Sequence, residues 1–207
     1  MCGRIVLTTS QLNNLNRFLA QWGTTQHDDV PRYNVPPTTD IWVVRRSPEA
    51  NNRELLQMRW GLIPSWTKDP KKSPLNNNAR AETVAEKPSF RSAYKSRRCI
   101  IPVTGFYEWK TEGKHKQPYY FHRPDGQDLA FAGLWESWNN IESCTIITCD
   151  ANVVMAPVHH RMPVILGDND HSEWLDPAAT DVSGLMTPCP ADEVTCYPVG
   201  PFNNVRN

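Results

Sequence analysis

The sequence has no excess of charge of either sign. Among its 207 residues, 22 are Lys or Arg and 22 are Asp or Glu, so the formal net charge is zero. A strongly basic chain attracts nucleic acid over its whole surface. This chain does not, so any binding to nucleic acid requires a local cluster of cationic side chains.

Long apolar runs are also missing. No stretch approaches the ~18 residues of a membrane-spanning helix, and no basic region followed by an apolar segment marks a signal peptide. None of the six cysteines forms a C-x-x-C pair. We therefore expect reduced thiols in a cytoplasmic protein that holds no metal ion and no cofactor.

Proline and tryptophan, by contrast, are abundant, with 18 and 8 residues. Prolines favour short elements joined by loops, and 32–37 and 61–78 read as loops. Apolar alternation predicts strands over 4–8, 41–45, 54–60, 98–103, 105–109, 119–122, 129–134, 144–149, 164–166 and 197–199. Helices are expected at 10–22, 79–85, 168–174 and 181–186.

The first of these helices is expected to be capped by Ser10 and to carry Leu19 and Trp22 on its apolar face. The chain shows no internal repeat and no linker of low complexity. We therefore predict one domain over residues 1–207. Its fold class is α+β, dominated by a mixed, barrel-like β-sheet with short helices at the periphery.

Cys2 is the first chemically reactive candidate. Because its side chain is small, removal of Met1 is expected, which leaves a free α-amine beside the Cys2 thiol. Such an amine has a pKa of ~7.7–8.0, and thiols are strong nucleophiles near neutral pH. This aminothiol can condense with an aldehyde to an imine and close to a thiazolidine. The alternative is an inert cysteine in a disordered terminus.

A second candidate group follows the proline-rich loop. Asn78 and Arg80 would present an amide and a guanidinium to a phosphate or a sugar, although turn chemistry alone also explains a run of asparagines. Trp60 and Trp66 flank a bend in the same loop. Both tryptophans can belong to the core, or one of them can offer a stacking platform for a base.

Glu108 lies inside a predicted strand among aromatic residues. Alternation places Phe106 and Lys110 on its face of the strand, and Tyr107 and Trp109 on the other. Aromatic neighbours would strip water from the carboxylate and raise its pKa toward the range of a catalytic acid or base. A surface glutamate paired with a lysine is the alternative.

A fourth candidate group joins His159, His160 and Arg161 in a loop before an apolar strand. Histidine changes its charge near neutral pH, which suits proton transfer. Neighbouring side chains of an extended chain point in opposite directions, so only one of the two histidines is expected to face a given site. A metal centre lacks convincing further ligands, His171 being the nearest.

Six motifs, taken in their order along the chain, resemble the SOS-response-associated peptidase family of abasic-site processing proteins. They are MCGR at 1–4, RYN at 32–34, WGLIPSW at 60–66, NARAET at 78–83, GFYEW at 105–109 and HHRMP at 159–163. The resemblance spans essentially the whole chain, and six ordered motifs with an N-terminal cysteine are highly specific.

The resemblance implies a covalent reaction. In this family the N-terminal cysteine forms a thiazolidine crosslink with the aldehyde of an abasic site in single-stranded DNA, which shields the lesion from strand cleavage. Residue by residue, Cys2 matches the nucleophile, Asn78 the asparagine beside the crosslink, Glu108 the catalytic glutamate and His159 the catalytic histidine.

The family's DNA contacts also have counterparts here. Arg4, Arg80 and Arg161 match arginines that contact phosphates, and Trp66 matches a residue near the stacked bases. The implied partner is single-stranded DNA that contains abasic sites. We expect a monomer in the cytoplasm, associated with the nucleoid when bound to damaged DNA, and no membrane partner.

Two other functions are compatible with the same residues. An N-terminal-nucleophile cysteine peptidase would use Cys2 as its nucleophile and the amine or His159 as its base, with the Met1–Cys2 bond of the chain itself as one substrate. A lyase activity on abasic DNA is a related expectation. A non-catalytic module would use Trp66 and the arginines to bind intact and abasic single strands equally well.

Overall fold

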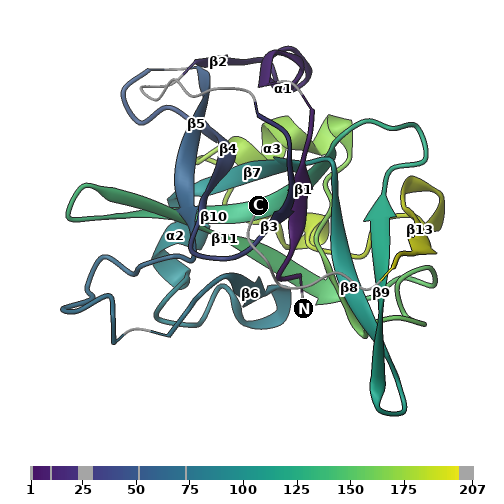
Figure 1. Cartoon of the computed structure of the whole chain (residues 1–207). Helices are drawn as coiled ribbons and strands as arrows, with labels where there is room; N and C mark the ends of the chain where they lie inside the picture. Colours follow the sequence, from purple (N-terminus) through teal and green to yellow (C-terminus); the bar gives the residue numbers. More distant parts are fainter. Residues whose placement is uncertain (1, 10, 23–29, 51, 73, 201–207) are drawn as a thin grey trace.

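Two β-sheets build the structure, and short helices lie around them (Figure 1). The computed structural model describes residues 2–9, 11–22, 30–50, 52–72 and 74–200. The strands are β1 (Ile5–Leu7), β2 (Ala20–Trp22), β3 (Arg32–Val35), β4 (Asp40–Arg46), β5 (Arg53–Trp60), β6 (Asn78–Arg80), β7 (Arg98–Val103), β8 (Gly105–Glu112), β9 (His115–His122), β10 (Leu129–Trp138), β11 (Ile141–Asp150), β12 (Arg161–Pro163) and β13 (Thr195–Pro198).

The helices are short. They are α1 (Gln11–Phe18), α2 (Arg91–Ser96) and α3 (His171–Leu175), with the 3-10 turns η1 (Ala81–Thr83), η2 (Asp168–Asp170), η3 (Ser183–Leu185) and η4 (Ala191–Glu193). Within the described ranges, none of them combines the length and the apolar character that crossing a membrane requires.

The larger sheet closes on itself. Its strands follow the order β12-β11-β10-β7-β4-β5-β2, and β5 pairs in parallel with β11 through Arg59 with Ser143 and Trp60 with Cys144. The strands β11, β10, β7, β4 and β5 therefore form a closed ring, and closure removes the open edges of a sheet. This ring confirms the prediction of an α+β fold dominated by a barrel-like sheet.

Apolar side chains from all sides of the ring fill its interior. Val43, Leu56, Ile101 and Phe131 lie on one face of the paired strands and have exposed fractions of 0–2%, and each such burial stabilises the fold by about 1.5–3 kcal/mol. Trp60 is also fully buried, and its indole N–H donates a 2.9 Å hydrogen bond to the carbonyl of Asn77. This bond ties the end of the long loop to the barrel.

The smaller sheet has the strand order β13-β9-β8-β1-β3. It packs on the barrel through phenylalanines. Phe106 of β8 stacks on Phe121 of β9 with 5.1 Å between ring centroids, and it meets Phe131 of the barrel edge-on at 5.5 Å. Because Phe106 and Glu108 share a face of β8, this packing turns Glu108 toward the junction of the two sheets.

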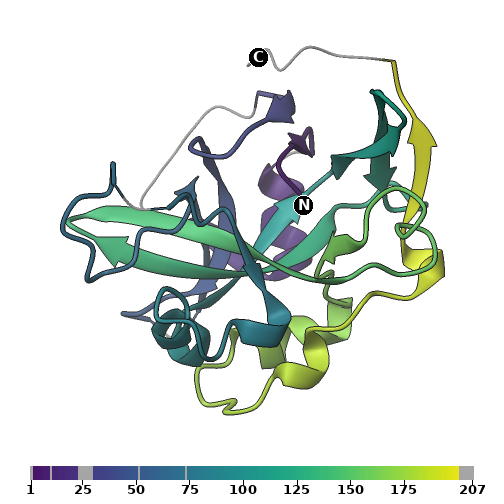
Figure 2. The ribbon, with the colours of Figure 1, turned by 90° about the horizontal axis from the view of Figure 1, so that it is seen from below.

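Strand β11 has partners along both of its edges. On one edge, β10 pairs with its first part and β12 with its last residues; on the other edge, β5 and then β6 pair in parallel with it. Figure 2 shows β10 and β11 as a long hairpin that projects beyond the barrel. Through its pairing with β6 and β12, β11 holds the motif NARAET along one edge and the motif HHRMP along the other.

The first predicted helix is shorter than expected. Helix α1 ends at Phe18, because Leu19 adopts a φ of 50° and β2 begins at Ala20. The prediction that Leu19 and Trp22 lie on an apolar helical face is wrong: Leu19 is 76% exposed and Trp22 lies in a strand. The predicted cap, Ser10, lies outside the described residues, as does Met1.

Other differences arise where pairing partners come from distant parts of the chain. The predicted loop 32–37 contains β3, which pairs with β1, and the predicted helix 79–85 consists of β6 followed by the turn η1. The predicted strand 164–166 forms only a bridge from Ile165 to Phe131, while the strand β12 lies just before it. The predicted helix 181–186 is the 3-10 turn η3.

Candidate active site

Cys2 is part of the core and not of a disordered terminus. It lies just before β1, and its exposed fraction is 1%. Burial, and then the negative charge of Glu108, raise the pKa of its thiol well above the ordinary value. The sulfur therefore keeps its proton at neutral pH. All six cysteines of the chain are free thiols.

Asn78 lies directly beside Cys2. Strand β6 pairs with β11 through Asn78 and Ile146, and this pairing fixes the asparagine at the edge of the barrel. Its Nδ2 atom donates a 2.8 Å hydrogen bond to the carbonyl oxygen of Cys2. Its Oδ1 atom is buried and has no hydrogen-bond partner among the described residues. Buried acceptors are normally paired, and a donor from a ligand would satisfy this one.

Glu108 approaches the same place from β8. Its exposed fraction is 4%, and its charge acts on both the Cys2 thiol and the His159 imidazole. The antiparallel pairing of β8 with β1, through Phe106 and Ile5, carries the glutamate to the segment that holds Cys2. Lys110, the lysine on the same face of β8, pairs with Glu112 at 3.0 Å.

His159 completes the group from the loop before β12. Its backbone N–H donates to the carbonyl of Met155 at 3.0 Å, which closes a turn. Its Nδ1 atom lies 3.0 Å from the backbone N–H of Arg161 and 3.1 Å from the carbonyl of the same residue. Without a hydrogen, Nδ1 can accept a bond from the N–H of Arg161. With a hydrogen, it can donate to the carbonyl of Arg161. The backbone of Arg161 therefore serves the imidazole in both of its charge states.

Burial lowers the pKa of His159 below its ordinary value of 6.5, and the charge of Glu108 opposes this shift. The imidazole is therefore mostly neutral at pH 7. In that state it can accept a proton from a reacting group, which is the role of a general base.

The two neighbouring histidines do not point in opposite directions, as the sequence predicted. Their rings stack with 4.5 Å between centroids and an angle of 22° between planes. The prediction fails because the chain here follows the turn closed at His159 and is not extended. His160 is exposed, so it lies against the solvent side of the His159 ring.

Arg161 is engaged within the protein. Its side chain is 7% exposed, and it donates to Glu82 at 2.6 and 2.9 Å, to Asp150 at 2.8 Å and to the carbonyl of Thr148 at 2.6 Å. The bonds from Arg161 hold the pKa of Glu82 below its usual value. The geometry makes Arg161 a brace between β12, β11 and η1. Its contact with phosphate stays a prediction.

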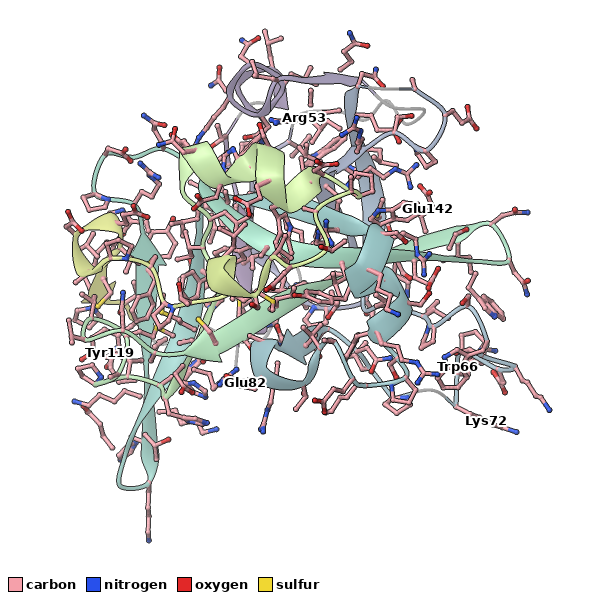
Figure 3. The ribbon with its side chains drawn as sticks, turned by 180° about the vertical axis from the view of Figure 1, so that it is seen from behind. Arg53, Trp66, Lys72, Glu82, Tyr119 and Glu142 are labelled. Atoms are coloured by element: carbon pink, nitrogen blue, oxygen red, sulfur yellow. The ribbon has the colours of Figure 1, made fainter. Side chains whose placement is uncertain are left out.

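Sequence reasoning missed the two carboxylates of this brace. Glu82 belongs to the motif NARAET but carried no predicted role, and Asp150 ends β11. Figure 3 labels Glu82 in the lower half of the molecule. The spacing of Asn78 and Glu82 within one motif was the available signal, because it links the residue beside Cys2 to the partner of Arg161.

The other predicted DNA contacts lie further out. Arg80 is exposed on β6, two residues from Asn78. Arg4 is half-buried, and its Nη1 atom donates to Asn34 Oδ1 at 3.3 Å. Trp66 is 63% exposed, on the loop that follows β5 (Figure 3). Of the two tryptophans in that motif, Trp60 is therefore core and Trp66 faces solvent.

The structure thus brings together Cys2, Asn78, Glu108 and His159 from four separate parts of the chain. No group of three His, Cys, Asp or Glu side chains that could hold a metal ion occurs in the described part of the chain. The assembled groups are a thiol, an amide, a carboxylate and an imidazole. Such a set suits nucleophilic attack with proton transfer.

Comparison with known proteins adds to this geometry. The family model described as SOS response associated peptidase (SRAP) matches residues 1–205. Abasic site processing protein YoqW of Bacillus subtilis is 41% identical over 213 residues, which cover 99% of this chain and 94% of that protein. Abasic site processing protein HMCES of Xenopus tropicalis is 34% identical over 207 residues, covering 86% of this chain and 62% of that protein.

Among solved structures, a protein from Bacteroides thetaiotaomicron has the same fold. It superposes with a TM-score of 0.85 at 28% sequence identity, and the match covers 96% of this chain and 92% of that chain. A protein from Bordetella bronchiseptica superposes with a TM-score of 0.82 at 29% identity, covering 96% of this chain and all of that one.

Proposed function

Because the chain belongs to the SOS response associated peptidase family, we propose that it processes abasic sites by forming a covalent crosslink to them in single-stranded DNA. The bond is a thiazolidine between Cys2 and the C1′ aldehyde of the lesion. The observation that carries the proposal is the convergence of Glu108 and His159 on Cys2, whose carbonyl is held by Asn78.

The reaction begins with the α-amine of Cys2, which removal of Met1 sets free. An abasic deoxyribose is mostly a closed hemiacetal, and Glu108 moves the proton that opens its ring. The amine then attacks the aldehyde carbon, and the aldehyde oxygen leaves as water, which gives an imine. His159 takes and returns the protons of this step through its neutral imidazole.

Ring closure uses the thiol. The Cys2 sulfur adds to the imine carbon, and its proton ends on the former imine nitrogen, so that one C–N and one C–S bond replace the C=O bond. The buried Oδ1 atom of Asn78 is suited to accept the hydrogen bond of the new ring N–H. The Cys2 carbonyl, bonded to Asn78 Nδ2, holds the residue in place during this step.

DNA binding draws on the cationic and aromatic groups around this centre. Arg80 and Arg4 are placed to contact phosphates, and Trp66 offers an exposed ring for a base. Such contacts are independent of base sequence and weaken with salt. They suit a lesion that has lost its base and therefore cannot be recognised by base pairing.

The protonation of Cys2 favours crosslinking over a peptidase reaction. A cysteine peptidase attacks with a thiolate, which requires a lowered pKa, and the pKa of this thiol is raised by burial and by Glu108. Crosslinking starts from the amine and needs the thiol only once an imine stands beside it. The purely non-catalytic alternative gives no reason for a carboxylate and an imidazole to flank the thiol.

The decisive experiment is the intact mass of the protein after incubation with a single-stranded oligonucleotide that carries one abasic site. The expected product has the sum of both masses less one water, and the unreacted protein lacks Met1. A tetrahydrofuran abasic analogue, which has no aldehyde, is the matched control and should give no adduct. Active protein that retains Met1, or an adduct with the analogue, contradicts the proposal.

A further inference from the structure

A second polar hollow lies at the other end of the molecule from Cys2. In Figure 1, β1 starts near the lower part of the view while α1 and β2 lie at the top, and Figure 3 labels Arg53 at that top end. The hollow measures about 420 Å³. Two arginines, two side-chain amides, one hydroxyl and two leucines line it, with no acidic side chain among the described residues of its lining.

The two arginines, Arg46 and Arg53, face each other across the ladder of β4 and β5 as direct antiparallel partners. Like charges at such positions repel and destabilise a sheet. The pKa of Arg53 is lowered by burial and then by the charge of Arg46, which agrees with this closeness. Two facing cations at the wall of a hollow create a place where an anion relieves the repulsion.

Arg53 is held in position by the protein. Its Nη1 atom donates to the carbonyl of Phe18 at 2.9 Å, and its Nη2 atom donates to the hydroxyl of Ser172 at 2.7 Å. The Ser172 oxygen accepts that bond, so its own hydrogen remains to be donated. Arg46 has a looser partner, because Asp176 lies 3.6 Å away and both side chains are more than 40% exposed. Exposed pairs of this kind are weak.

One of the two side-chain amides of the hollow has an acceptor that lacks a hydrogen-bond donor. Asn52 Nδ2 donates to Gln21 Oε1 at 2.8 Å, but Asn52 Oδ1 is buried without a hydrogen-bond partner among the described residues. Buried acceptors are normally paired. A hydroxyl or amino group of a ligand would supply the missing hydrogen, which distinguishes a nucleotide from a bare anion.

The rim of the hollow is apolar and conformationally strained. Leu19 is 76% exposed at a φ of 50°, a conformation that non-glycine residues adopt at a cost. Leu175 lines the hollow from α3. These two leucines give the apolar part of a ligand a surface to contact.

We propose that this hollow binds a phosphate monoester attached to a sugar, such as a nucleoside 5′-monophosphate or the 5′-phosphate end of a DNA strand. The phosphate dianion matches the two charges of Arg46 and Arg53, and its three terminal oxygens can accept bonds from both guanidinium groups and from Ser172. A carboxylate has one charge and two oxygens, so it satisfies fewer of these donors. The free 3′-hydroxyl of a nucleotide would donate to Asn52, or, at a DNA end where O3′ is esterified, an amino group of the base would do so. Leu19 would cover the sugar or base.

Titration calorimetry in a buffer free of phosphate and sulfate tests the proposal. The probes are deoxyadenosine 5′-monophosphate and deoxyadenosine, which differ only in the phosphate. The monophosphate should bind and the nucleoside should not. Arg46→Gln should weaken binding roughly tenfold or more, as expected for one charge-assisted contact. Arg91→Gln, which removes an exposed arginine of α2, should bind as the wild type does.

A second arm identifies the source of the phosphate and separates this site from Cys2. Displacement of the monophosphate by a 5′-phosphorylated oligonucleotide, but not by its 5′-hydroxyl form, indicates a DNA end; displacement by neither indicates a free nucleotide. Cys2→Ala should bind the monophosphate normally, so failure of the crosslinking proposal leaves this result intact. Equal binding of nucleotide and nucleoside, no binding of either, or unchanged affinity in Arg46→Gln overturns the proposal.

Discussion

Arg80 and Arg161 match the same role in the family motifs, yet the protein treats them differently. Arg161 is buried behind the site and bonded to Glu82, Asp150 and Thr148, whereas Arg80 stands in solvent on β6. The same contrast separates the groups around Cys2, which are mostly buried, from the surface that would receive DNA. Groups that react must be held and desolvated, and cations that bind a polyanion remain hydrated and exchangeable.

The largest effect is expected on the buried, reacting side of this contrast. There, Cys2→Ser should abolish the denaturation-resistant complex with abasic single-stranded DNA. A hydroxyl is a much poorer ring-closing nucleophile than a thiol, so only a hydrolysable imine would remain. Denaturing electrophoresis without a reducing step for the imine measures the adduct. Cys196→Ser, which changes a half-buried thiol of β13, is the control and should crosslink normally. A heat-stable serine adduct at wild-type yield would refute the thiazolidine.

The next largest effect concerns the proton-transfer groups. Glu108→Gln and His159→Ala should each slow single-turnover crosslinking by about 10²–10⁴-fold, the usual range for a lost acid or base. Binding to single-stranded DNA should persist in both variants. Glu112→Gln and His115→Ala change exposed residues of the same sheet and serve as controls. If the two site variants react at the wild-type rate, the aminothiol acts without their help.

Arg161→Ala should mainly destabilise the fold, by about 1–2 kcal/mol or roughly 2–8 °C in Tm, because it removes the donor to the carbonyl of Thr148 and to two solvent-exposed carboxylates. Thermal unfolding followed by circular dichroism measures this loss. An unchanged Tm together with weakened DNA binding would instead assign Arg161 to phosphate, as the family resemblance implies.

Arg80→Ala should do the reverse. Its exposed side chain makes little contribution to stability, so unfolding should change by less than about 0.5 kcal/mol. The slope of log affinity against log salt for single-stranded DNA should fall by about 0.7–1 unit, the effect of one lost phosphate contact. A normal slope with slower crosslinking at saturating DNA would place Arg80 in the chemical step.

The smallest expected effect belongs to His160→Ala. The charge of His160 contributes to lowering the pKa of His159, so its removal should move that pKa upward by less than about one unit. Crosslinking in the wild type should slow as the pH falls, first as the α-amine of Cys2 protonates and again through the His159 pKa, with this second midpoint below 6.5. In the variant this midpoint should lie higher, with little change in rate at pH 8. An identical profile would mean that the stacked ring does not influence the reaction.

The sequence predicted well wherever a residue's position depends on its own neighbours. Alternation located β4, β5, β7 and β8 and grouped Glu108 with Phe106 on one face of its strand. It left a surface position for Glu108 open, and the structure buries both side chains. Prediction from the sequence failed where a partner far along the chain determines whether a strand forms or a side chain is buried. Strand β3 exists because β1 lies beside it, and Arg161 is buried because Glu82, 79 residues away, meets it. The stacking of His159 on His160 followed from a turn that no local pattern revealed.

The family motifs supplied the candidate site residues but not the bonds between them. The hydrogen bond from Asn78 to the Cys2 carbonyl joins residues that are 76 positions apart. Asn78 reaches this place because β6 pairs with β11. No spacing rule within one sequence indicates such a contact.

The pairing of β11 along both edges has a consequence for motion. Its middle residues carry β6, with Asn78, on one side, and its last residues carry β12, with the backbone of Arg161, on the other. Local opening in proteins follows cooperative units, and a doubly paired central strand opens last. Amide hydrogens of β11 should therefore exchange on the timescale of global unfolding. If DNA binds here as proposed, the motions that admit or release it would come from the surrounding loops, while β11 stays paired.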